Sequence, residues 1–202
     1  MEAKDRVILK SSELFLQTGI RLVTMDQIAT EMGMSKRTIY EMFKDKDDLL
    51  AQCLESMFRQ DIKELHEIIS GSDNAIEALY LIGQHGEKKK ASVNRIFFED
   101  FRKLYPVLWE HFRVKSGPGR ESVSFTILQK GLGEGIFRKD LNLEIVDIFI
   151  HSMMETCYNA EIFPANTDMK EIIGNVIIPY FRGIATRKGQ ELIEKYFSNE
   201  KT

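Results

Sequence analysis

Side chains that suit contacts with nucleic acid are concentrated in one short segment of the chain. Arg37 can donate two hydrogen bonds to guanine, and the Thr38 methyl or hydroxyl can meet thymine or either base type. Lys36 precedes them, and Tyr40 offers its hydroxyl to a phosphate. Lys46 combines a cation with the free N–H groups of an expected helix start, which favours a phosphate contact. The segment therefore predicts a DNA-binding surface.

Capping residues and glycines define the helices that would position these side chains. Thr24 begins one helix and Gln27 follows three residues later, as in a capping box. Gly33 tolerates a positive φ and is expected to end this helix after two turns. Ser35 is expected to cap the next helix, which runs to about Phe43. The helix that begins at Thr24 also has free backbone N–H groups at its start, and these are expected to contact a phosphate on the side opposite Lys46.

The spacing of small and apolar residues in this segment is typical of a helix-turn-helix. Ala29 permits a close crossing of the two helices, Gly33 supplies the turn, and Ile39 anchors the second helix against the first. Other apolar residues complete a small core: Ile28, Met32 and Phe43. A cluster of charges is often plain solvated surface. The combined turn, cap and anchor spacing favours instead a second helix that enters the major groove.

The rest of the chain is expected to be helical as well, because prolines are few and alternating β-branched residues are scarce. Ten or eleven helices are predicted, including 5–18, 46–70, 75–85, 89–105, 121–135, 143–163 and 188–198, with another that begins near Asp168 and bends at Pro179. Gly19 is expected to close the first helix in the left-handed conformation. Pro106 is expected to break or restart a helix, and residues 115–120, KSGPGR, to form a flexible linker. The predicted fold class is all-α.

Residues Arg6–Leu54 resemble the N-terminal domain of the TetR family of regulators. The family's Thr-x-Tyr-x-x-Phe-x-x-Lys pattern appears here as Thr38, Tyr40, Phe43 and Lys46, and further matches are Thr24, Ile28, Ala29 and Gly33. The resemblance implies a helix-turn-helix domain over 1–46 that binds operator DNA, and a helical effector-binding and dimerisation domain over 47–202. Glu41 departs from the pattern, since the family often has an aromatic or basic residue there. An acid repels phosphates, so Glu41 is expected to point away from them or to contribute to site choice.

A homodimer is expected through the later helices. The segment Gly131–Leu141 is similar to the turn between the family's two dimer-forming helices, which implies that helices 121–135 and 143–163 pair with their symmetry mates. Within 143–163 the polar residues form one narrow stripe: Glu144, Asp147, His151, Glu155 and Asn159. An apolar face this wide must be covered by a partner subunit or line a cavity. The dimer is favoured because a two-fold partner matches a palindromic operator.

A small hydrophobic effector is expected, because the family resemblance implies a ligand pocket in the later part of the chain. Candidate lining residues are apolar and aromatic: Phe98, Phe101, Tyr105, Trp109, Met153, Met154 and Tyr158. For each of them singly, plain core packing is the favoured alternative.

Composition limits the other classes of function. The net charge of −3 excludes bulk attraction to DNA as the source of affinity, so a local basic patch must supply it. No catalytic constellation, metal-ligand spacing of the four histidines or cofactor motif is evident, and neither a signal peptide nor a membrane span is expected. These features favour a cytoplasmic protein, and the family resemblance implies a repressor that an effector releases from its operator. An activator, or a helical ligand-binding or enzymatic protein with a merely structural N-terminal unit, remains an alternative.

Overall fold

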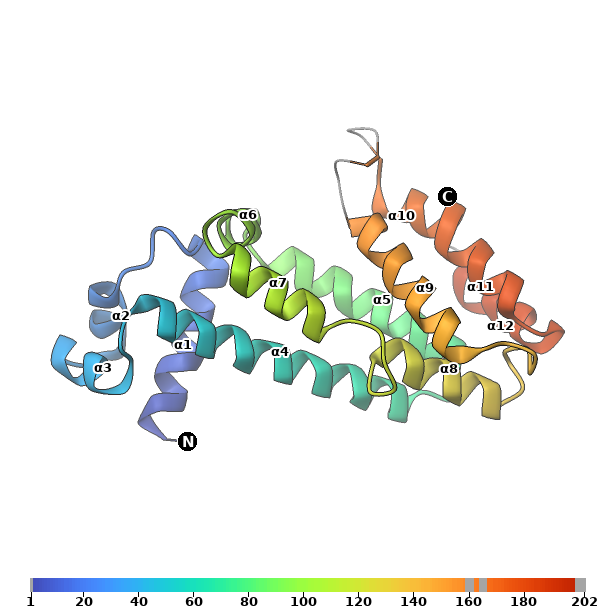
Figure 1. The fold of residues 1–202 in the computed structure, drawn as a ribbon, viewed down its shortest axis with the longest axis horizontal. Coiled ribbons are helices and arrows are strands. Elements are labelled where there is room, and N and C mark those ends of the chain that lie inside the picture. Colours follow the sequence, from blue (N-terminus) through green and yellow to red (C-terminus); the bar gives the residue numbers. More distant parts are fainter. Residues whose placement is uncertain (1, 159–161, 164–166, 199–202) are drawn as a thin grey trace. The chain divides into compact units, whose positions relative to one another are not determined.

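The computed structural model describes residues 2–158, 162–163 and 167–198, and in these ranges the chain is helical without a β-strand (Figure 1). The helices are α1 (Ala3–Thr18), α2 (Met25–Met32), α3 (Lys36–Met42), α4 (Lys46–Gly71), α5 (Ala75–Ser92), α6 (Arg95–Leu104), α7 (Pro106–Lys115), α8 (Val123–Gly133), α9 (Leu143–Tyr158), α10 (Met169–Ile172), α11 (Ile178–Ile184) and α12 (Arg187–Phe197). A π-helical turn, Ile173–Ile177, joins α10 to α11 in one continuous helical run. The predicted all-α class is confirmed. None of the described helices combines the length and apolarity needed to cross a membrane.

The chain divides into two compact units. Unit 1 consists of Met1–Glu64 and His85–Lys115, and unit 2 of Leu65–Gln84 and Ser116–Thr202. The helices α4 and α5 therefore each contribute residues to both units. Unit 1 is larger than the helix-turn-helix domain expected over residues 1–46, and that functional boundary remains a prediction.

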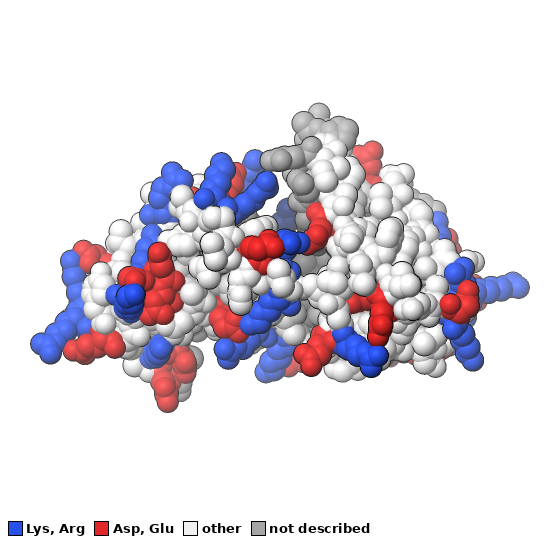
Figure 2. Space-filling view, viewed as in Figure 1, with Lys and Arg blue, Asp and Glu red and all other residues white. Residues whose placement is uncertain are grey.

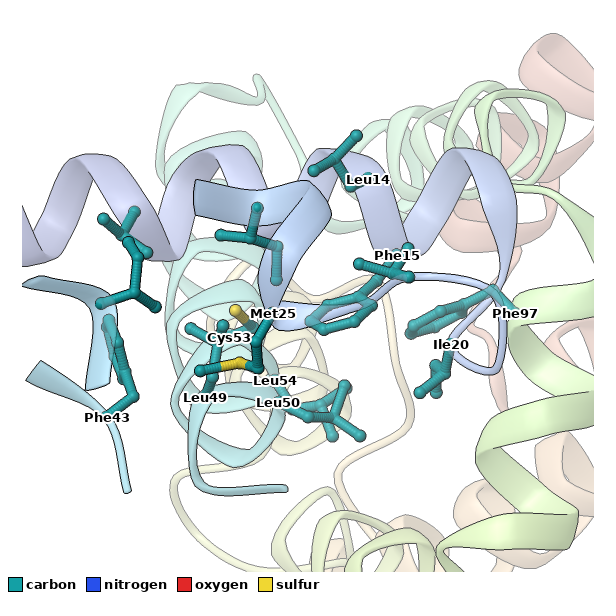
Figure 3. Close-up of a cluster of buried hydrophobic side chains, with 14 of the residues drawn as sticks. Leu14, Phe15, Ile20, Met25, Phe43, Leu49, Leu50, Cys53, Leu54 and Phe97 are labelled. Carbon is teal, nitrogen blue, oxygen red and sulfur yellow. The ribbon is translucent and has the colours of Figure 1, made fainter. Parts of the chain in front are cut away.

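The core of unit 1 joins the N-terminal helices to the first half of α4. On α1 the buried apolar residues recur at helical spacing and include Val7, Leu14 and Phe15. The helix α4 contributes Leu50 and Cys53 to the same core. Figure 3 shows Leu14 and Phe15 of α1 and Leu50 and Cys53 of α4 among the side chains of this core, with Phe15 near Ile20 and Phe97. Full burial of one large apolar side chain is worth roughly 1.5–3 kcal/mol. This core therefore provides the rigid support on which the two short helices α2 and α3 rest.

The end of α1 differs from the expectation. Gly19 has φ +92° and ψ 158°, so its φ is positive but its conformation is not the left-handed helical one that was predicted. Its N–H still donates to the Phe15 carbonyl over 2.9 Å. A Cβ atom at Gly19 would lie 2.6 Å from Ile96 Cγ2 of α6. The close approach of α6 therefore requires glycine here, in addition to the positive φ.

The boundary between α5 and α6 also differs from the prediction. A break was expected near residues 86–88, but α5 continues to Ser92 and the chain turns at Val93 and Asn94. Asn94 caps α6 by accepting from the Ile96 N–H, while its own backbone and side-chain nitrogens donate to the carbonyls of Leu16 and Gln17. The end of α1 therefore determines where α6 begins.

Prolines act as expected in the later helices. Pro106 is the first residue of α7, where its missing N–H has no cost. Where a bend was predicted at Pro179, the helical run has a π-helical turn just before this proline, which cannot donate the backbone hydrogen bond that regular α-helix requires. The helix predicted to reach Phe163 is described as α9 to Tyr158, and residues 162–163 form a turn and a bend.

Cys53 should be chemically inert in the folded protein. Its side chain is fully buried, and burial raises the pKa of the thiol to about 12. Since the thiolate is the reactive form, a Cys157→Ser variant should not react with a thiol reagent at pH 8 until denaturant unfolds it. Rapid reaction of one thiol under native conditions would contradict this burial.

Candidate nucleic-acid interface

The turn between α2 and α3 has the geometry that the sequence predicted. Gly33 adopts φ 62° and ψ 31°, the left-handed conformation, and ends α2. Met34 then donates its N–H to the Ala29 carbonyl over 2.9 Å. Ser35 caps α3 through its hydroxyl, which accepts the Thr38 N–H over 3.1 Å. These contacts arise within a few residues, so the local sequence is sufficient to produce them.

A small apolar core fixes α3 against α2. Ile28 and Ala29 of α2 are buried, as are Ile39 of α3 and Phe43 directly after it. Met32 packs partly buried against the same core. The predicted helix-turn-helix packing is therefore confirmed.

The opposite face of α3 presents the candidate DNA-binding residues to solvent. Lys36, Arg37, Thr38 and Tyr40 are all exposed, and 51% of Tyr40 is accessible despite its large apolar ring. Because the intervening Ile39 is buried, the helix has one anchored face and one free face. The structure thus brings four of the six predicted DNA-binding residues onto one exposed surface.

Both cations of this surface are paired with carboxylates. Lys36 Nζ lies 2.5 Å from Asp26 Oδ2 of α2, and Arg37 Nε lies 2.9 Å from Glu41 Oε1 one turn later. Figure 2 shows blue and red side chains intermixed over the part of unit 1 where α2 and α3 lie. Glu41, which was expected to point away or to influence site choice, contacts Arg37. The role of Asp26 was missed, because ten residues separate it from Lys36.

The two flanking candidates lie at helix starts. Thr24 accepts the Gln27 N–H over 3.1 Å, which forms the first half of the predicted capping box. Lys46 is the first residue of α4, and its Nζ lies 3.4 Å from the Arg21 carbonyl. Burial lowers the pKa of the Lys46 ammonium, and the carboxylates of Asp47 and Asp100 act in the opposite direction. Lys46 is therefore half-buried beside the chain that links α1 to α2.

The structure divides the seven candidate ligand residues between the two units. In unit 1, Phe101 is a core residue with Trp109 stacked edge-on at 5.3 Å, whereas Phe98 is exposed. The Tyr105 hydroxyl donates to Asp47 over 2.8 Å, and burial together with this carboxylate raises the pKa of Tyr105 to about 12.

The other three candidates belong to α9 in unit 2. Met153 is buried and Met154 is partly buried in its apolar clusters, while the side chain of Tyr158 lies outside the described residues. For Phe101 and Met153 the observed environment is core packing.

One residue of the predicted polar stripe on α9, Asp147, lies in the interior, whereas Glu144 and Glu155 are exposed and Asn159 lies outside the described residues. Asp147 is only 1% exposed and accepts hydrogen bonds from the Ser122 and Ser124 hydroxyls and from the Gly119 N–H. The segment 115–120, predicted as a linker, is therefore attached to α9 at Gly119. The exposed residues of α9 include three large apolar side chains, Ile145, Ile148 and Phe149, and also Ser152 and Thr156.

Comparison with known proteins extends these observations. The family model described as bacterial regulatory proteins, tetR family, matches residues 8–53. The chain is 20% identical over 150 residues to the HTH-type transcriptional repressor KstR2 of Mycolicibacterium smegmatis, with 73% of each chain covered. It also shares its fold with a transcriptional regulator from Cytophaga hutchinsonii, with a TM-score of 0.63, 18% identity, and 97% and 93% of the two chains covered. A TetR/AcrR family regulator from Thermobifida fusca has a TM-score of 0.61 and 19% identity, with 89% and 97% covered.

Proposed function

We propose that this chain, whose residues 8–53 match the family model of bacterial regulatory proteins of the tetR family, is a transcriptional repressor that a small hydrophobic effector releases from operator DNA. The observation that carries the proposal is the exposed face of α3, where Lys36, Arg37, Thr38 and Tyr40 project from a helix anchored by Ile39. The similarity to a named repressor favours repression over activation.

In the proposed complex, α3 enters the major groove and its flanks contact phosphates. Arg37 would leave Glu41 and donate to guanine, and Thr38 would contact a neighbouring base. Tyr40, Thr24 and Lys46 would bind the backbone on either side. Since the net charge is −3, affinity must come from this local surface and from the simultaneous binding of two half-sites.

The second half-site requires a homodimer, which we assign to α8 and α9. The apolar face of α9 includes Ile148 and Phe149, each more than half exposed in the single chain. An identical face on a second copy would cover it and form a four-helix bundle with two-fold symmetry. Two-fold repressors of this kind bind half-sites about 34 Å apart, one turn of DNA, so we expect an operator with this spacing.

Effector control is proposed to act through α4, because this helix contributes residues to both units. A ligand bound in the helical region after residue 46 would change the orientation of α4 and hence the separation of the two α3 helices. The reciprocal coupling between effector and operator is typically ~1–3 kcal/mol. Equal operator affinity with and without every effector tried would remove the basis for this control.

The DNA-binding surface is tested by gel shift on DNA from upstream of the protein's own gene. Arg37→Ala should weaken operator binding by roughly 5–150-fold, since a bidentate contact to a base is worth about 1–3 kcal/mol. Tyr40→Phe, which removes one phosphate contact, should weaken operator and unrelated DNA alike by roughly 2–10-fold.

Arg187→Ala is the matched control, because Arg187 is equally exposed and pairs with Glu191 one helical turn away. It should bind as the unaltered protein does. Weak, salt-insensitive binding that all three variants share would instead support a helical protein whose N-terminal unit is merely structural.

Glu41→Gln should increase affinity for DNA and reduce discrimination. The substitution releases Arg37 from its 2.9 Å ion pair and removes a negative charge from the phosphate-facing surface. An exposed ion pair is worth about 0.2–1 kcal/mol, so a gain of up to about fivefold is expected, and it should be larger for non-operator DNA. Glu191→Gln serves as the control. An unchanged ratio of operator to non-operator affinity would show that Glu41 has no part in site choice.

A further inference from the structure

Three side chains that commonly bind metal ions meet between α4 and α5 in unit 1. Asp61 and Glu64 lie three residues apart on α4, so they share one face of that helix. His85 of α5 lies beside them, with its Nε2 3.4 Å from Asp61 Oδ1 and 3.5 Å from Glu64 Oε2. One ligand atom from each residue falls within 4.8 Å of the other two. This group was not predicted, since its members come from two different helices.

These separations match those of a tetrahedral metal centre. Zinc binds imidazole nitrogen and carboxylate oxygen at about 2.0–2.2 Å, so neighbouring ligand atoms in a tetrahedron lie roughly 3.3–3.6 Å apart. The two measured distances from His85, 3.4 and 3.5 Å, fall in that range. All three side chains are partly buried, so their rotamers are already restricted and binding a metal would cost little further conformational entropy. One imidazole and two carboxylates leave a fourth position for water or another ligand.

A cation of the protein itself already occupies this position. The ammonium of Lys89, one helical turn after His85, contacts Asp61 Oδ1 and lies 3.7 Å from Glu64 Oε2. Lys89 is 44% exposed and has a flexible side chain, so it can move into solvent without disturbing α5. The two carboxylates thus hold a positive charge where a divalent ion would bind, and Lys89 would compete with that ion.

We propose that Asp61, Glu64 and His85 bind a divalent transition-metal ion, with zinc as the best fit, and that Lys89 is displaced when it binds. Glu64 ends the first segment of unit 1 and His85 begins the second. A bound ion would therefore link α4 to α5 at the residues where both helices pass into unit 2. This site goes beyond the proposed function and does not depend on DNA binding.

The test is titration of the tag-free, full-length protein with zinc chloride by isothermal calorimetry. One ion per chain is expected. His85→Ala and Asp61→Asn should each weaken zinc binding by at least about tenfold. Even the loss of a residue that only hydrogen-bonds to a metal ligand typically lowers metal affinity about 10–100-fold. Lys89→Met, which keeps every ligand, should tighten binding by roughly two- to fivefold. His111→Ala, an exposed histidine of α7 outside the group, should bind zinc as the unaltered protein does.

Thermal unfolding gives an independent readout. Zinc should raise the unfolding midpoint of the unaltered protein and of Lys89→Met, and should leave that of Asp61→Asn unchanged. The proposal is overturned if the unaltered protein takes up no zinc, if Asp61→Asn binds it equally well, or if Lys89→Met does not tighten binding. The Lys89 variant decides the matter even where loss of a ligand impairs folding, because it removes only the competitor.

Discussion

Phe43→Ala should abolish operator binding by unfolding the helix-turn-helix unit. Phe43 directly follows α3, its side chain is 1% exposed, and it belongs to the same apolar cluster as Ile28, Ile39 and Leu49. Truncation of a buried phenylalanine costs about 3–5 kcal/mol, partly because of the cavity left behind. This is a large fraction of the ~5–15 kcal/mol by which a whole domain is stable.

Chemical denaturation followed by circular dichroism would measure the loss, and gel shift would measure its consequence for DNA. Tyr40→Ala is the control, because it removes an aromatic ring of similar size from the exposed face of the same helix. That variant should lose DNA affinity but keep the free energy of unfolding within about 0.5 kcal/mol. Equal stability of the Phe43 and Tyr40 variants would contradict the assignment of buried and exposed faces on α3.

Ile148→Asp should convert the proposed dimer to monomers. In a two-fold interface the substituted residue occurs twice, so two carboxylates would be buried near each other without partners. An uncompensated buried charge costs about 3–5 kcal/mol, which is sufficient to dissociate the dimer at micromolar concentration. The monomer retains its α3 surface but cannot bind a second half-site. Its operator affinity should therefore fall further than that of any variant that loses a single DNA contact.

Light scattering after size-exclusion chromatography would report the molecular mass. Val107→Asp is the matched control, since Val107 of α7 is an even more exposed apolar residue outside α8 and α9. This control should leave the mass and the operator affinity unchanged. A dimer that persists in Ile148→Asp would move the interface away from this face of α9.

The helix-turn-helix could be predicted because its determinants are local. The caps Thr24 and Ser35 accept hydrogen bonds from N–H groups three residues away. Gly33 adopts the left-handed conformation, which depends on the residue type at this one position. The buried Ala29 and Ile39 are likewise near in sequence. Within such short separations the order of residue types determines the geometry with little help from the rest of the chain.

Features that depend on distant contacts could not be predicted. The start of α6 was misplaced because Asn94 is held by a carbonyl 77 residues earlier. The conformation of Gly19 depends on the approach of Ile96, and the buried Asp147 on hydroxyls more than 20 residues earlier. Periodicity indicates that a residue is on a given face, but not which side chains of other helices meet that face.

The amino-acid sequence alone thus determined the all-α class, the helix-turn-helix and the exposed face of α3, because helix periodicity and capping act over a few residues. Tertiary structure decided the chemical state of that surface, since the partner of Lys36 lies on α2 and Glu41 proved to bind Arg37. It also brought Asp61 and Glu64 of α4 close to His85 of α5. Ion pairs and metal ligands depend on distances of a few ångströms between helices, and only packing determines those distances.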